Sequence, residues 1–312
     1  MVLGLVKYDR NQHVEGNKTM GDSLYRLNQS VVTELDALNT QPVLLYALDG
    51  HVDSGMVAGL VISDLIDGGG LKRVATFDTD QLFNYRTRRP PMVCGPDGWA
   101  ICGRVELVID LVRDQANVPV LVMYGPEPDL KWEGFAQSVL EIVELLDARL
   151  ALGFYGQSRM VPHTRPPSVH GPAETEEAEA QAVDLYTRLH APGSAMAMIE
   201  FVLRRVARPA HTLTADVPSY LSNVPYSKAA LAMILAINQT GGLQLDTSRL
   251  AEASEHSAKR LDAEVAKTGD LSRTVKELEQ RFDKLHGPVV TQPKMVVNQL
   301  VKEIQAYLAD QS

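Results

Sequence analysis

Residues 42–70 read PVLLYALDGHVDSGMVAGLVISDLIDGGG and hold both halves of an α/β unit. Residues 42–50 form an apolar run bounded by a proline and a glycine, the pattern of a strand buried on both faces. Asp53 or Ser54 can then cap a helix that runs to about Ile66, where three glycines stop it. The stretch therefore predicts a strand, a turn and a helix at the opening of an α/β fold.

The same alternation continues along the chain. Further strands are predicted at 73–78, 104–112, 118–125, 150–156 and 210–215. Further helices are predicted at 132–149, 174–189, 195–205 and 228–237. Strands that alternate with helices favour a three-layer α/β/α sandwich with a mostly parallel sheet. We expect this domain to span residues 41–242, after a polar N-terminal extension (1–40) with one short helix at 30–38.

Residues 243–312 change character, because strand patterns stop and apolar residues recur at helical spacing. The stripe consists of Leu250, Leu261, Val265, Leu271, Val275, Leu278, Phe282 and Leu285. It predicts a helical hairpin with an apolar seam, followed by a last helix at 293–308. Such a seam is either core against the sheet domain or a surface for self-association, and the pattern leaves both open.

Composition excludes several classes of function. The chain has 312 residues and a net charge of −9 without a basic stripe, which argues against nucleic acid and anionic membranes as partners. No apolar run approaches the roughly 20 residues of a membrane span, and the first residues lack the pattern of a signal peptide, so we expect a cytoplasmic protein. Cys94 and Cys102 form no metal-binding motif, and no dinucleotide or P-loop motif is present. We therefore expect no metal and no cofactor.

Ligands of open parallel sheets gather at the carboxyl ends of the strands. The polar and aromatic residues that follow the predicted strands are Asp53, Asp80, Arg89, Glu127, Trp132, His163 and Arg165. The last two lie in VPHTRP (161–166), where two prolines restrict the backbone. We predict that Arg165, Asp53 and Glu127 face one cleft, with Trp132 closing one side and His163 nearby.

Two interpretations of this cleft remain open. The planar fork of Arg165 suits a carboxylate or phosphate, and Asp53, Asp80 and Glu127 are candidate acceptors, so the cleft is either a structural ion network or a ligand site. The residues favour ion pairing for Arg165.

No nucleophile–base pair can be assembled, since GQSRM (156–160) lacks the closing glycine of a nucleophile elbow. We therefore expect a non-catalytic binding or chaperone-like protein. The alternative is an enzyme of nucleoside phosphorylase or hydrolase type, in which Arg89 or Arg165 holds an anion and Asp53 or Glu127 acts on the substrate.

Five motifs occur in an order that resembles the proteasome assembly chaperone family, in the branch of the second chaperone and its bacterial members. They are GHVDSG (50–55), FDTDQLFNYRTRRP (77–90), GPEPDLKWEGF (125–135), VPHTRP (161–166) and VPSYLSNVPYSKAAL (217–231). The resemblance covers roughly residues 40–240, and five ordered motifs are more specific than any one of them.

The resemblance implies an α/β/α fold similar to nucleoside phosphorylases, a cytoplasmic location, a protein partner and self-association, with a trimer favoured. Eukaryotic relatives are non-enzymatic chaperones of the proteasome α-ring and end in a hydrophobic residue, a tyrosine and one last residue. This sequence ends AYLADQS, so Tyr307 is not next to last. We therefore do not expect the proteasome as the partner.

Overall fold

The computed structural model of the protein describes residues 23–286 apart from 39, 51, 96–97, 104 and 172–191. The predicted helices at 174–189 and 293–308 and the residues around Tyr307 lie outside this part of the chain. The remaining predicted elements can all be compared with the structure.

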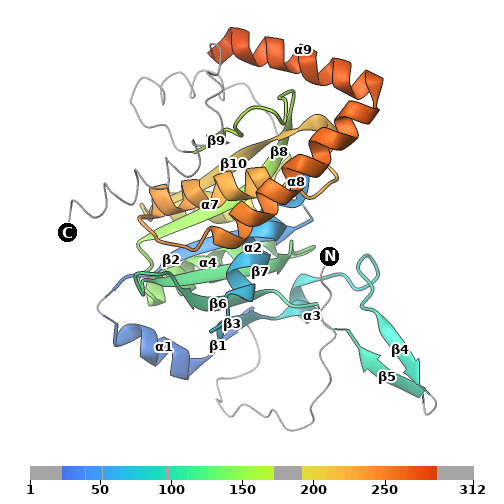
Figure 1. The fold of residues 1–312 in the computed structure, drawn as a ribbon. Coiled ribbons are helices and arrows are strands. Elements are labelled where there is room, and N and C mark those ends of the chain that lie inside the picture. The colour runs from blue at the N-terminus through green and yellow to red at the C-terminus, as the bar shows by residue number, and fades with distance from the viewer. Residues whose placement is uncertain are drawn as a thin grey trace.

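The centre of the fold is one eight-stranded sheet with the strand order β1-β3-β6-β7-β2-β8-β10-β9 (Figure 1). Its strands are β1 (Tyr25–Leu27), β2 (Val43–Asp49), β3 (Lys72–Phe77), β6 (Val108–Arg113), β7 (Pro119–Pro126), β8 (Leu150–Arg159), β9 (Val169–His170) and β10 (Ala210–Pro218). The neighbours β7, β2, β8 and β10 are parallel, and β3 runs in the same direction, whereas β1, β6 and β9 are antiparallel. The predicted strands are all present, and the mostly parallel sheet is confirmed.

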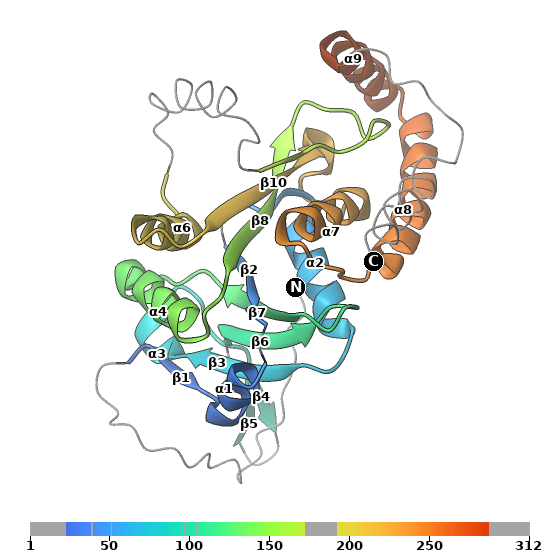
Figure 2. The ribbon, with the colours of Figure 1, turned by 90° about the vertical axis from the view of Figure 1, so that its left-hand side faces the viewer.

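Helices cover both faces of this sheet and complete the predicted three layers (Figure 2). The helices are α1 (Gln29–Asp36), α2 (Val57–Asp67), α3 (Thr79–Leu82), α4 (Trp132–Leu145), α6 (Ala195–Arg205), α7 (Ser227–Gly241), α8 (Ser248–Lys267) and α9 (Gly269–His286), with 3₁₀ turns η1 (Ser54–Met56) and η2 (Ser219–Leu221). One face packs on α1, α4 and α6, and the other on α2, α7 and α8. Of the described helices, none is long and apolar enough to cross a membrane.

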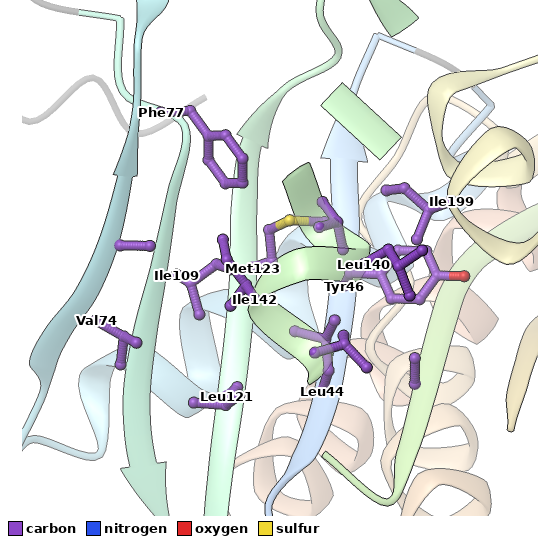
Figure 3. Packing of buried hydrophobic residues seen from close by; sticks show 14 of the residues in the cluster. Leu44, Tyr46, Val74, Phe77, Ile109, Leu121, Met123, Leu140, Ile142 and Ile199 are labelled. Carbon is purple, nitrogen blue, oxygen red and sulfur yellow. The ribbon is translucent and has the colours of Figure 1, made fainter. Parts of the chain in front are cut away.

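Each face of the sheet has its own apolar core. On the first face, Ile109, Leu121 and Met123 of the sheet lie against Leu140 and Ile142 of α4 (Figure 3). All five are at most 5 % exposed, and a fully buried side chain of this size contributes about 1.5–3 kcal/mol. The strands therefore read as continuous apolar runs because both of their faces are buried.

The residues before the first predicted strand also join the sheet. Strand β1 pairs antiparallel with β3, with Tyr25 opposite Phe77, and α1 buries Val31, Val32 and Leu35 in the first core. Residues 25–36 therefore belong to the packed body. The division of the chain at residues 40 and 242 stays a prediction.

The C-terminal helices form, but not the predicted hairpin. Helix α8 packs on α7, and α9 leaves its end at a steep angle instead of folding back along it (Figures 1 and 2). Thr268 is the single residue between the two helices, and an antiparallel reversal needs a loop of about 2–5 residues. The stripe residues Val265, Val275 and Leu278 are nevertheless buried within the chain.

A two-stranded hairpin, which we call the arm, projects from the body beside α3 (Figure 1). It consists of β4 (Met92–Gly95) and β5 (Gly98–Cys102) and was not predicted. Met92 and Val93 are exposed, and Trp99 is 71 % exposed. The arm therefore presents apolar side chains to solvent.

Candidate functional site at the carboxyl edge of the sheet

The four parallel neighbours β2, β7, β8 and β10 end at Asp49, Pro126, Arg159 and Pro218. Their carboxyl ends lie along one edge of the sheet, as the alternation of strands and helices predicted. The segments that leave this edge carry the candidate residues Asp53, Glu127, Trp132, His163 and Arg165. Their contacts show what each one does.

Asp53 connects two layers through backbone hydrogen bonds. Its carboxylate accepts from the N–H groups of Ala58 (3.0 Å) and Gly59 (3.2 Å) at the start of α2, and from the N–H of Gly156 (2.9 Å) on β8. Burial raises the pKa of the Asp53 carboxyl, and these hydrogen bonds oppose the rise. Asp53 therefore serves as the predicted helix cap, and its hydrogen-bonding capacity is used within the fold.

Glu127 and Trp132 lie in the opposite layer. The Glu127 carboxylate accepts from the N–H of Ala195 (2.7 Å), the first residue of α6. The Trp132 indole packs on the first core, and its Nε1–H donates to the Pro128 carbonyl (2.5 Å). Because the sheet separates this layer from α2 and α8, Trp132 does not close a cleft over Asp53.

Asp80 and Arg89 lie on the segment that leads to the arm. The Tyr85 hydroxyl donates to Asp80 Oδ1 (2.5 Å), and Arg89 is exposed. Both residues follow β3, which is separated from β8 by β6, β7 and β2 in the sheet. Neither is an ion-pair partner of Arg165.

Arg165 pairs with α9 instead of with a strand-end acid. Its Nε and one terminal nitrogen donate to the two carboxylate oxygens of Asp283 (2.8 and 2.7 Å), and its other terminal nitrogen donates to Glu279 (3.3 Å). Thr164 Oγ1 also donates to Glu279 (2.5 Å). The predicted acceptors Asp53, Asp80 and Glu127 were therefore wrong, because α9 brings its own carboxylates to the loop.

His163 makes the matching contact with α8. The Tyr220 hydroxyl lies 2.7 Å from its Nδ1 and Asp262 Oδ1 lies 3.2 Å from its Nε2, while the backbone N–H of His163 donates to the same hydroxyl (2.8 Å). The buried ammonium of Lys228 donates to the carbonyls of His163 (2.8 Å) and Arg165 (3.0 Å). VPHTRP is thus the segment that fastens the two C-terminal helices to the sheet.

The cavity beside Arg165 does not hold a ligand-sized space. It measures about 10 Å³, room for one water, and is lined by Arg165, Asp216, Tyr226 and Phe282 together with the prolines of the loop. Neither Asp53 nor Glu127 lines it. Among the described residues, no three His, Cys, Asp or Glu side chains gather as metal ligands would.

Acidification should weaken the contact between His163 and α8. Burial lowers the pKa of His163, so the folded protein favours the neutral ring. Below about pH 6.5 the unfolded chain takes up the proton first, so the stability that His163 contributes above that pH is lost as the pH falls. We expect the difference in free energy of unfolding between the wild type and His163→Gln, from urea titrations, to shrink between about pH 7.5 and pH 5.5. A difference that grows on acidification contradicts this prediction.

The sequence of the chain matches a known family over most of the described residues. A family model for the PAC2 family matches residues 47–265, from β2 to the end of α8. The chain belongs to the PAC2 family. Three of the motifs that we quoted for the resemblance, including VPHTRP and the segment with Tyr220 and Lys228, lie wholly inside the match, which confirms the predicted family.

Solved structures of family members share the fold. A Corynebacterium glutamicum protein of unknown function is 30% identical, with a TM-score of 0.73 over 85% of this chain and 99% of that chain. The Mycobacterium tuberculosis protein Rv2714, also of unknown function, is 29% identical, with a TM-score of 0.73 over 87% of this chain and 92% of that chain. Rv2125, a proteasome-assembly chaperone homologue from the same organism, is 22% identical, with a TM-score of 0.65 over 75% and 99%. No curated protein matches the sequence.

Sequence reasoning missed the partners of VPHTRP. Tyr220 and Lys228 lie in the fifth quoted motif, which was a signal that could have been used. Asp262, Glu279 and Asp283 are ordinary charged residues of helices, and no local pattern distinguishes them from solvated neighbours.

Proposed function

We propose that this PAC2 protein is a non-catalytic, chaperone-like protein of the cytoplasm that holds another protein on its surface. Membership of the family supports a chaperone-like role, and a proteasome-assembly chaperone homologue has the same fold. The partner is proposed as a protein and not as nucleic acid or a membrane, in keeping with the net charge of −9.

One observation carries the proposal: the acids and bases at the carboxyl edge are used to build the fold. Asp53 and Glu127, on which the enzyme alternative depends, accept hydrogen bonds from the first turns of α2 and α6. His163 and Arg165 hold α8 and α9. The side chains that remain exposed at this edge, such as Met56 and Met160, are apolar and suit contact with protein.

Two measurements on the full chain test this function. We expect an equimolar amount of the protein to suppress the light scattering of reduced insulin, and nucleosides, phosphate and sugars to leave its melting temperature unchanged. Insulin that aggregates at its normal rate refutes the chaperone-like role. A rise in melting temperature with one nucleoside, together with its turnover, would establish an enzyme instead.

We also propose that the protein self-associates as a trimer, through the arm. The helical stripe that first suggested self-association is buried within the chain at Val265, Val275 and Leu278. The arm is the better candidate, because an isolated two-stranded hairpin is marginally stable and Trp99 is exposed. An arm that lies on the body of the next copy makes a head-to-tail contact, which closes into a ring such as a trimer.

Changing Trp99 should therefore change the mass of the particle. We expect light scattering to report three chains for the wild type at micromolar concentration and one chain for Trp99→Asp, since a charge at the centre of an apolar contact opposes association. Phe201→Asp is a matched control, because Phe201 is also exposed (55 %) but lies on α6. A wild-type mass of one chain, or a trimer that Trp99→Asp leaves intact, contradicts the proposal.

A further inference from the structure

We infer that four exposed apolar side chains at the carboxyl edge, Val52, Met56, Met160 and Val224, form a docking surface for an extended apolar segment of a partner protein that carries a carboxylate. We call these four residues the rim patch; they are 43–58 % exposed. The inference rests on the proposed function and names the place and the chemistry of the contact.

Hydrogen bonds gather the rim patch around one loop. Gly55 N–H donates to the Ser222 carbonyl (2.8 Å) and Tyr226 N–H donates to the Gly55 carbonyl (2.9 Å), which places Met56 beside the loop that carries Val224. Ser219 Oγ lies 3.6 Å from the sulfur of Met160, at the base of the same loop. Three segments that are distant in sequence thus present apolar side chains together.

The backbone at Met56 is strained. Gly55 (φ 68°) and Met56 (φ 51°) are consecutive left-handed residues, and this conformation costs a residue with a side chain about 1–2 kcal/mol. The strain leaves Met56 43 % exposed instead of burying it. Strained backbone that exposes an apolar side chain is common at binding sites, and the flexible thioethers of Met56 and Met160 adapt to varied side chains.

Charge beside the rim patch selects a carboxylate. Arg159, the neighbour of Met160, is half exposed, and His170 is 54 % exposed. One acid faces both of them: Asp216 Oδ1 lies 3.6 Å from Arg159 Nε and 3.0 Å from His170 Nε2. With His170 protonated, two cations share one anion, and the surplus positive charge complements a partner carboxylate.

The occupant is a different protein and not a second copy bound through the arm. The arm leaves the sheet between β3 and β6, whereas the rim patch lies at the ends of β2 and β8 and in the loop after β10. An assembly built through the arm therefore leaves the rim patch accessible.

Peptide binding to the full chain tests the inference. The probes are a fluorescein-labelled pentapeptide of leucine, valine and alanine with a free terminal carboxylate, and the same peptide as an amide. We expect fluorescence anisotropy to show binding of the acid, about tenfold weaker binding of the amide, and a similar loss for Met160→Ser with Val224→Ser. Leu130→Ser is the control, since Leu130 is 47 % exposed on the segment before α4; it should bind like the wild type.

The outcomes separate this inference from the proposed function. Equal binding by the double variant and the wild type, or no binding by the wild type, overturns the rim patch. If insulin is still protected in that case, the chaperone-like role stands without the patch. If insulin aggregates normally, the proposed function fails whatever the peptides do. A double variant with an altered particle mass overturns the inference by showing that a second copy is the occupant.

Discussion

Gly156→Ala is expected to lower the free energy of unfolding by about 3 kcal/mol or more. A Cβ at this position would lie well inside van der Waals contact of the Ser54 carbonyl oxygen and 2.8 Å from a methyl of Val57. Neither neighbour can move freely, because η1 is tied to the loop at Ser222 and the N–H of Gly156 donates to Asp53. The strand β8 requires a glycine here so that the turn after β2 can pass against it.

The same change at Gly59 provides the control. Gly59 lies in the exposed face of α2, and no atom lies within 4 Å of the Cβ that alanine would add. Alanine should therefore stabilise the helix by about 0.5–1 kcal/mol relative to glycine. Urea unfolding of the two variants should give changes of opposite sign. Equal small effects would show that the approach of η1 to β8 is looser than the structure has it.

Arg165→Ala is expected to lower the free energy of unfolding by about 2 kcal/mol and to free α9 from the sheet. The variant removes three charge-assisted hydrogen bonds and the packing of the arginine stem. The loss stays below the roughly 3–5 kcal/mol of a fully buried pair, because Glu279 and Asp283 are 26 % and 30 % exposed and regain water.

Two measurements together check the role of Arg165. Thermal unfolding should show the lower stability, and limited proteolysis should cut faster near Thr268, between α8 and α9. Arg273→Ala is the matched control: its pair with Asp270 has partners that are 74 % and 95 % exposed, and we expect no change. Folding that is unaffected by Arg165→Ala contradicts the fastening role and would return Arg165 to the ligand interpretation.

The strands and the first helices could be predicted because their signals are local. Residues 42–50 and 118–125 are apolar at successive positions, and only a strand buried on both faces explains such short runs. Asp53 could be predicted as a cap for a similar reason, since an acid just before a helix satisfies its free N–H groups. The arm was missed because β4 and β5 are short and have no buried face that would impose a pattern.

The sequence by itself determined the α/β class, the order of most elements and the family, because apolar periodicity and ordered motifs belong to consecutive residues. It also placed Asp53, Glu127 and Arg165 at the carboxyl edge, since parallel strands share that edge. Only the tertiary structure decided the partners of these residues. Arg165 and Asp283 are 118 positions apart, and many carboxylates satisfy an arginine equally well on paper. The packing of α8 and α9 against the sheet selects one of them, because an ion pair forms only between groups that the fold brings within a few ångströms.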